Sequence, residues 1–390
     1  MATSGKHHSV SLKRPAHDAL RRQLLVATAG ALALPHVQAQ AQQRPGDALQ
    51  PRPLVFPRDH GTHNETRTEW WYLTGHATNA QGRAFGFQVT FFRSRVDGTQ
   101  DLQSRLAAKQ LLFAHAAITD VQGGRLLHDQ RIARWNGEPP AQAERGVFAS
   151  AEDTHVVLRD WSLRRAPDGS YAARVTGDEL RIELGAVPQQ AWLLQGEDGL
   201  SRKGPDPAQA SFYVSQPHLA VRGTLGLKGE RFEVQGTAWL DHEWSEALLH
   251  PEAVGWDWIG MNLFDGHCVT AFQLRRKDGS KVWAGGSFRA AGSAQSPTDI
   301  YRFRPGEVDF KPQRWWTSPL TRARYPVEWM VRTPADFYTV KAVIDPQELD
   351  SRASTGTVYW EGLSDLFDSN GKAVGRGYLE MTGYAQRLVL

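Results

Sequence analysis

The sequence contains very little cysteine and none of the short motifs that mark several common catalytic sites. Cys268 is the single cysteine among 390 residues, so no intramolecular disulfide can form. No Walker loop, CxxC pair, HExxH helix or GxSxG elbow is present. Phosphate cradling, thiol redox chemistry and the usual serine-hydrolase elbow therefore lack support. A chain without disulfides must be held together by its core, which fits a large fold.

The chain also lacks an apolar run long enough to cross a bilayer, including near its start. Residues 24–34 form an apolar stretch of 11 residues, which is too short for a membrane span. The stretch follows Arg21 and Arg22 and precedes the small-residue cleavage pattern Val37-Gln38-Ala39. These features predict a secretory signal peptide over residues 1–39, of the twin-arginine kind, and a linker over residues 40–51. We therefore expect a periplasmic or secreted protein with no transmembrane segment after cleavage.

An excess of positive charge is absent once the leader is removed. The whole chain has a formal net charge of +3, but five of its 45 basic residues and one of its 42 acidic residues lie in the leader. The remaining 351 residues carry a formal net charge of −1. No electrostatic argument for nucleic acid or an anionic membrane surface remains.

The mature sequence has the pattern of β-structure nearly throughout. Residues 85–93 alternate apolar with small or polar side chains, as a half-buried strand does. Turn signals such as Asn79-Ala80-Gln81-Gly82 and Pro167-Asp168-Gly169-Ser170 separate many short runs of this kind. Only residues 101–113 and 345–349 have helical character. The pattern predicts an all-β protein built of antiparallel barrels or sandwiches.

A weak internal repeat divides the mature chain in two. The segment that begins at Trp71 and ends at Arg93 resembles the segment from Trp258 to Arg275. The closing segments, residues 236–244 and 377–384, also resemble each other. We interpret the halves as two consecutive barrels of one ancestry. The predicted domains are residues 52–245 and 250–390.

The densest group of chemically active side chains is Asp241-His242-Glu243-Trp244, followed by Trp256-Asp257-Trp258. Strand alternation places His242 and Trp244 on one face and Asp241 and Glu243 on the other. Titratable groups among aromatic walls suit acid–base chemistry on an apolar substrate. A structural interpretation, in which buried tryptophans surround acids paired with arginines, fits the same residues.

Two further groups deserve comparison with this segment. In Glu69-Trp70-Trp71-Tyr72, Glu69 and Trp71 share one strand face, while Trp70 and Tyr72 share the other. His60 and His63 could offer two metal ligands, joined by His242 or Glu69, but the spacing is common and favours a solvated loop. We therefore expect no metal and no cofactor.

The motifs resemble those of a known family. They resemble the carotenoid 1,2-hydratase (hydroxyneurosporene synthase) family, whose exported members include AttH-like proteins with tandem lipocalin-like domains. The resemblance rests on residues 68–75, 86–93, 113–115, 239–245, 255–258, 325–329, 360–362 and 377–384. It implies two lipocalin-like barrels, hydration of a terpenoid double bond, and His242 and Trp244 as active-site residues. The predicted signal peptide differs from what is expected of the carotenoid hydratases in this family, because their substrate lies inside the cell.

Hydration of an unactivated alkene sets physical requirements. The acid must stay protonated near neutral pH, which burial of a carboxyl group can achieve. We expect Asp241 or Asp257 as this acid, with Glu243 third, and His242 as the base with Glu69 or Asp257 in hydrogen-bonding reach. The aromatic walls for the carbocation and the ligand are predicted to come from six residues. These are Trp70, Trp71, Tyr72, Trp244, Trp256 and Trp258.

Two other functions fit the same sequence. The protein could instead be a non-catalytic carrier of an isoprenoid or lipid, beside an ABC-type exporter as the AttH-like resemblance implies. A structural role, with the tryptophans as plain core, is the third hypothesis. The carrier and enzyme hypotheses both require a lipophilic small molecule, and they differ in whether a carboxyl group faces the cavity.

Overall fold

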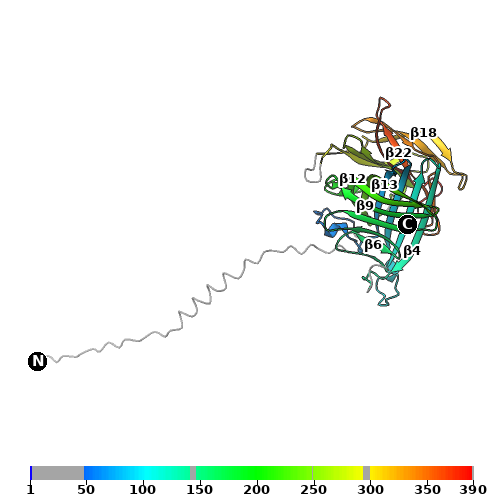
Figure 1. Ribbon diagram of the computed structural model, residues 1–390. Coiled ribbons are helices and arrows are strands. Elements are labelled where there is room, and N and C mark those ends of the chain that lie inside the picture. The colour runs from blue at the N-terminus through cyan, green and yellow to red at the C-terminus, as the bar shows by residue number, and fades with distance from the viewer. Residues whose placement is uncertain (2–47, 141–145, 248, 293–298, 389–390) are drawn as a thin grey trace. The chain divides into compact units, whose positions relative to one another are not determined.

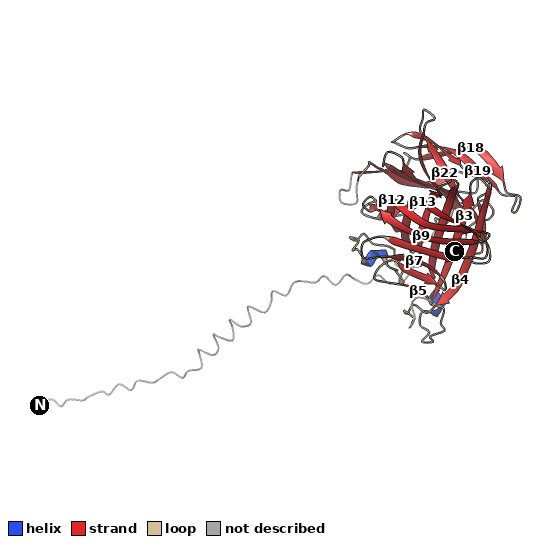
Figure 2. Ribbon diagram, in the orientation of Figure 1, coloured by secondary structure: helices blue, strands red, loops and turns tan. Residues whose placement is uncertain are grey.

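The computed structural model describes Met1 and residues 48–140, 146–247, 249–292 and 299–388. The predicted signal peptide lies outside these residues, as does most of the predicted linker. Strands make up most of the described chain, and its only helices are two short 3-10 turns, Arg58–His60 (η1) and Asp97–Thr99 (η2) (Figure 2). No helix among the described residues has the length and hydropathy needed to cross a membrane.

The first half of the chain forms one antiparallel sheet, whose strand order is β4-β3-β2-β1-β13-β12-β9-β8-β7-β6-β5 (Figure 1). Its strands are Thr68–Thr78 (β1), Ala84–Arg95 (β2), Gln110–Asp120 (β3), Arg125–Trp135 (β4), Val147–Ala149 (β5), His155–Leu158 (β6), Trp161–Arg165 (β7), Tyr171–Thr176 (β8), Leu180–Pro188 (β9), Leu193–Leu194 (β10), Leu200–Arg202 (β11), Ala210–Leu227 (β12) and Glu230–Ser245 (β13). The short strands β10 and β11 pair with β12. Strand β4 lies beside β5 and β6, so the sheet is a nearly closed barrel.

The second half forms a second antiparallel sheet, whose strand order is β17-β16-β15-β14-β23-β22-β20-β19-β18. Its strands are Gly255–Leu263 (β14), Cys268–Arg275 (β15), Lys281–Arg289 (β16), Ile300–Arg302 (β17), Asp309–Thr317 (β18), Arg324–Arg332 (β19), Phe337–Ala342 (β20), Glu348–Ser351 (β21), Thr357–Phe367 (β22) and Ala373–Met381 (β23). Strand β21 pairs with β22. The predicted fold class, consecutive antiparallel lipocalin-like barrels, is confirmed.

The internal repeat has a topological counterpart. In the first sheet β1 pairs with β2 on one side and with the closing strand β13 on the other. In the second sheet β14 pairs with β15 and with the closing strand β23 in the same way. The chain passes from one sheet to the other between Ser245 and Gly255.

The two segments predicted to be helical are not helices. Residues 101–109 form turns and loop, and residues 110–113 begin β3. Strand β3 is buried on nearly its whole length, because one face packs in the barrel and the other faces the second sheet. A strand buried on both faces loses its alternation and cannot be told from a helix by pattern alone. Residues 345–349 enter β21, where pairing with β22 decides the conformation.

Three apolar cores follow from the alternation of side chains. Trp71, Leu73 and Leu240 belong to the core inside the first sheet. A second core, which contains Ile259, lies inside the second sheet. A third core contains Tyr72, together with other side chains from the outer faces of both sheets. Part of the outer face of each sheet is therefore buried against the other sheet, whereas strands such as β8 and β9 keep exposed outer faces.

The two sheets approach each other closely at Gly86 on β2. A Cβ atom added to Gly86 would lie 2.8 Å from the hydroxyl oxygen of Tyr378 on β23 and 3.0 Å from the Cβ atom of Leu363 on β22. Only a residue without a side chain fits at this point. This contact holds the outer faces together beside the pocket described next.

Candidate functional site

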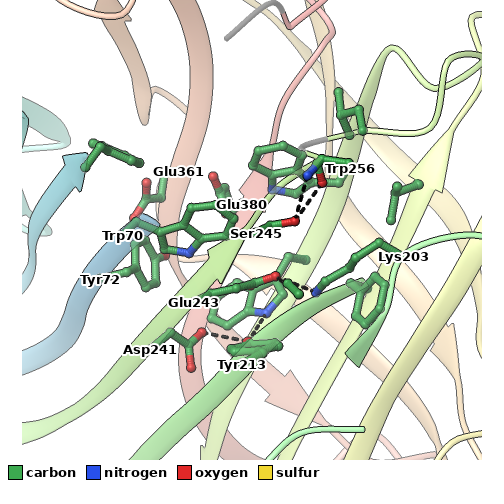
Figure 3. Close-up of a pocket in the computed structure, with 17 residues that line it drawn as sticks. Trp70, Tyr72, Lys203, Tyr213, Asp241, Glu243, Ser245, Trp256, Glu361 and Glu380 are labelled. Carbon is green, nitrogen blue, oxygen red and sulfur yellow. Dashed lines mark hydrogen bonds and ion pairs between the residues drawn. The ribbon is translucent and has the colours of Figure 1, made fainter. Parts of the chain in front are cut away.

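A pocket with largely aromatic walls lies between the outer faces of the two sheets (Figure 3). Strands β1, β2, β12 and β13 supply one wall, and β14, β15, β22 and β23 supply the other. Seven aromatic side chains line it, and these are Trp70, Tyr72, Phe92, Tyr213, Trp256, Trp258 and Phe272. Four carboxyl groups also line it, and these are Asp241, Glu243, Glu361 and Glu380.

Strand β13 presents its two faces to different environments. Asp241 and Glu243 line the pocket, whereas His242 and Trp244 do not. His242 and Trp244 are 1% exposed and pack on the other side of the strand, inside the first barrel. The expected alternation is therefore present, but the two residues that the family resemblance implies for the active site, His242 and Trp244, do not face this pocket. The pocket lies outside the barrel wall, so it receives the opposite set of side chains.

His242 belongs to a buried polar network centred on Glu69. The Nε2 atom of His242 lies 2.9 Å from Oε1 of Glu69, which confirms the predicted reach of Glu69 to this histidine. Arg93 donates from Nε to Oε2 of Glu69 at 2.8 Å. Burial opposes the charge of Glu69, but Arg93 and the two neighbouring histidines, His63 and His242, hold its pKa well below the ordinary value.

His63 is the second histidine of this network. Its Nδ1 atom lies 2.8 Å from Oε1 of Glu69, and its Nε2 atom lies 3.0 Å from Oδ1 of Asp59. Each ring nitrogen of His63 therefore faces a carboxylate oxygen. The His63 ring stacks on Trp244 with a centroid distance of 3.8 Å. The solvated-loop interpretation of His60 and His63 is wrong, because both are at most 2% exposed.

The ligand atoms of His63, Glu69 and His242 all lie within 4.8 Å of one another, which is the kind of group that can hold a metal ion. Glu69 already hydrogen-bonds to both rings and to Arg93, whereas Nδ1 of His242 has no hydrogen-bond partner among the described residues. Burial lowers the pKa of His242, and the ring then donates from Nε2 to Glu69. This geometry holds the inside of the first barrel together.

Asp257, the other predicted acid, lies on the inner face of the second sheet. Its Oδ2 atom is 2.9 Å from Nε of Arg275 and 2.8 Å from Nε2 of Gln273. Tyr384 donates its hydroxyl to Oδ1 at 2.9 Å. Asp257 does not line the pocket, because the adjacent Trp256 and Trp258 take the pocket face of β14.

Asp241 lines the pocket and is held by three hydrogen bonds. Ser215 Oγ and Trp239 Nε1 donate to Oδ1 at 2.6 and 2.7 Å. Tyr213 donates its hydroxyl to Oδ2 at 2.7 Å, and Trp258 donates from Nε1 to the Tyr213 oxygen at 2.9 Å (Figure 3). Burial raises the pKa of Asp241 to about 7, although these donors favour its charged form.

Glu243 is paired with the lysine that lines the pocket. Lys203 Nζ lies 2.9 Å from Oε1 of Glu243, and Ser211 donates a short hydrogen bond to the same oxygen. The ammonium group also lies 4.7 Å from the Tyr213 ring centroid and 4.3 Å from that of Phe272. Because Lys203 is paired with Glu243, the other three carboxyl groups of the pocket lining have no basic side chain of the lining as a partner.

Glu361 and Glu380 are the two pocket acids that sequence reasoning missed. They are direct cross-strand neighbours on β22 and β23, so their side chains lie on the same face at adjacent positions. Burial, followed by the nearby charge of Glu380, raises the pKa of Glu361 well above its ordinary value. Burial raises the pKa of Glu380 to about 7. Burial and the neighbouring charge therefore favour the neutral form of Glu361 at neutral pH.

Glu361 has polar contacts on both sides of its carboxyl group. Gln88 donates from Nε2 to Oε2 of Glu361 at 2.8 Å. The hydroxyl of Tyr72 contacts the same carboxyl group and favours its charged form, but burial outweighs this contact. Both acids stood in the motifs over residues 360–362 and 377–384, which was the signal available in the sequence.

The aromatic residues predicted to bind the ligand also divide into two groups, one that lines the pocket and one that does not. Trp70, Tyr72, Trp256 and Trp258 line the pocket. Trp71 and Trp244 do not, and each instead stacks on a histidine of the buried network. Trp71 lies 4.8 Å from His242 between ring centroids.

The fold and the pocket define a tandem lipocalin-like protein with an acidic, aromatic site between its sheets. The AttH-like family model matches residues 47–384, and the chain belongs to this family. It is 43% identical to an AttH protein of Nitrosomonas europaea, whose crystal structure aligns over 86% of this chain and 99% of that chain with a TM-score of 0.78.

Two more distant structures share the fold. Kievitone hydratase from Nectria haematococca is 13% identical, with 86% of this chain and 94% of that chain covered and a TM-score of 0.63. CghA with Sch210972 is 12% identical, with 83% and 90% covered and a TM-score of 0.51. A comparison with curated protein sequences finds no match.

Proposed function

We propose that this protein is a hydratase-like enzyme that adds water across a carbon–carbon double bond of an isoprenoid or another lipophilic substrate. The observation that carries the proposal is the carboxyl pair of Glu361 and Glu380 in an aromatic pocket. The pocket lysine, Lys203, is already bound to Glu243. A protonated acid among apolar walls is the group that alkene protonation requires.

In this mechanism Glu361 is the acid and Glu380 the base. The π electrons of the alkene take the proton of Glu361, which leaves a carbocation on the more substituted carbon. Water adds its oxygen to that carbon and loses a proton to the carboxylate of Glu380. A proton then passes from Glu380 to Glu361 across the pair, and the net change is the addition of one water molecule.

The remaining pocket residues stabilise the cation in this proposal. The ring faces of Trp70 and Trp256 come from opposite sheets and attract positive charge. Asp241 carries a partial negative charge at neutral pH because its pKa is about 7. Its three donors favour the charged form of the carboxyl group, so Asp241 is protonated less often than Glu361 and is the better electrostatic partner for the cation.

The fold shared with kievitone hydratase agrees with this proposal, since that protein is a hydratase by name. The carrier hypothesis uses the same aromatic walls but gives no task to a protonated carboxyl group in the pocket. Export through the predicted leader remains part of the proposal, and an ABC-type export partner follows from the AttH-like resemblance alone.

Turnover in heavy-oxygen water tests the proposal. We expect the purified mature protein to form an oxygen-labelled alcohol from at least one member of a panel of acyclic isoprenoids. If wild-type protein binds panel members and forms no labelled alcohol from any of them, the enzyme proposal fails and the carrier function replaces it. Native mass spectrometry of protein purified without detergent reports the bound molecule in either case.

A further inference from the structure

A second cavity between the sheets is adjacent to the pocket that holds the carboxyl groups. The two cavities share four lining residues, and these are Trp70, Phe92, Trp256 and Glu380. Trp70 comes from β1 of the first sheet and Trp256 from β14 of the second. Both indole rings appear beside Glu380 in Figure 3. The two cavities, called the first and second lobes below, therefore adjoin at these side chains.

The second lobe differs from the first in its polar groups. Its polar lining consists mainly of hydroxyl groups, which are those of Thr68, Ser94, Thr355, Thr357, Tyr359 and Thr382. Phe92, Phe113 and Leu388 supply apolar surface. Hydroxyls can donate or accept, so they suit an uncharged polar group of a ligand.

The second lobe offers no cation that is free to bind an anionic group. Arg93 borders it, but this residue bonds to Glu69 at 2.8 Å. His115 is uncharged, because burial lowers its pKa to about 3, and its ring nitrogens lie 2.8 Å from the Tyr359 hydroxyl and 2.9 Å from Ser354 Oγ. Glu380, at the junction with the first lobe, is itself an acid. A carboxylate group of a ligand would therefore find no partner here.

We propose that the two lobes hold a single elongated, largely apolar molecule that passes between Trp70 and Trp256 and ends in an uncharged hydroxyl or carbonyl group. The middle of this molecule lies beside Glu380 at the junction, and its polar end lies among the hydroxyls of the second lobe. This assignment of the substrate class rests on the proposed function of the carboxyl pair. Molecules that fill the first lobe alone bind more weakly.

Binding of three isoprenoid alcohols tests the proposal without requiring turnover. Geraniol, farnesol and geranylgeraniol lengthen by one isoprene unit each, and binding is followed by quenching of tryptophan fluorescence. We expect affinity for the wild-type protein to rise with length. Replacing Ser94 with phenylalanine fills the second lobe, so S94F should lose about tenfold in affinity for geranylgeraniol and little for geraniol.

Matched variants keep the result interpretable. S94A preserves the space of the lobe and should retain the dependence on length, whereas T355W fills the lobe from the loop between β21 and β22 and should abolish it. Farnesene, which lacks the hydroxyl of farnesol, should bind more weakly than farnesol. The proposal is overturned if none of the alcohols binds, if affinity is independent of length, or if S94F and T355W weaken all three alcohols equally. Wild-type binding that depends on length without formation of labelled alcohol would instead refute the enzyme proposal and leave the two-lobed site intact.

Discussion

Glu361 and Glu380 face each other across β22 and β23, and burial raises the pKa of both. Burial and the neighbouring charge favour the neutral form of Glu361 at neutral pH, because two adjacent carboxylates in an apolar wall repel each other. Such a pair has a cost in stability that a protein with only an architectural need for these strands would avoid. The predictions below follow from this pair and from the second, separate network around Glu69.

Replacing Glu361 with glutamine should remove the proton donor while keeping its shape. We expect E361Q to lower the rate of alcohol formation in heavy-oxygen water at least about 100-fold, which is the usual size of a general-acid contribution. Its melting temperature should not fall, since a neutral amide replaces a buried acid. D365N, on the same strand and paired with Arg376 at 2.6 Å, is the control and should retain activity. Equal loss of activity in both variants would contradict the assigned role.

The pair should also make the protein less stable as pH rises. The pKa of Glu380 is raised in the folded state to about 7 from an ordinary value of 4.5. The folded protein therefore binds more protons than the unfolded chain between these values, and the free energy of unfolding falls with rising pH in that window. The loss from this group is at most about 3 kcal/mol.

Comparison with E380Q isolates this contribution. Glutamine does not titrate, so the stability difference between E380Q and wild type should grow in favour of E380Q from pH 5 to pH 8. Urea unfolding at each pH measures it. The difference removes the opposite effect of acids such as Glu69, whose lowered pKa favours the folded state at higher pH. If the stability difference between E380Q and wild type stays constant across this range, the pKa of Glu380 is not raised in the folded protein.

The network around Glu69 should matter for stability and not for chemistry. E69Q removes the charge that faces Arg93 and two histidines, and breaking such a buried pair typically costs about 3–5 kcal/mol. E183Q is the control, because Glu183 forms only an exposed pair with Arg181 and should change stability by less than about 1 kcal/mol. Folded E69Q should still form labelled alcohol. If E69Q is stable but inactive, Glu69 and its partner His242 take part in catalysis and the assignment to stability alone is wrong.

Export should leave a shortened chain. Mass analysis of the protein recovered from outside the cytoplasm should find a new amino terminus near Gln40 or Gln42, since the leader pattern ends at Ala39. Substituting lysine for both Arg21 and Arg22 should block export if the twin-arginine route is used. An intact Met1 outside the cytoplasm would refute the signal peptide.

Alternation and turn chemistry were enough to predict the fold class from the sequence. Gly82 and Gly169 adopt positive φ angles of 79° and 85° at predicted turns, as these turns require. The candidate site was predicted only in part. The sequence separates Asp241 from His242 onto two faces, but both faces of this part of β13 are buried. Hydrophobicity therefore does not tell which face lines a barrel core and which meets the second sheet.

Glu361 and Glu380 were not predicted as site residues from the sequence, for a different reason. They are 19 positions apart in sequence, and their adjacency depends on the pairing register of β22 and β23. A one-residue change of register would separate them, and register is set by tertiary packing as well as by the turn. Neither acid has a distinctive sequence neighbour comparable to the histidine beside Asp241.

The separation of faces along β13 lets selection act on the two faces independently. Substitutions at Leu240, His242 and Trp244 alter the inside of the first barrel, whereas substitutions at Asp241 and Glu243 alter the pocket. Adjacent residues of β13 therefore affect different properties, which are the packing of the barrel and the lining of the pocket. Relatives could exchange one substrate for another through changes at every second position of a strand, while the intervening positions keep the barrel folded during the exchange.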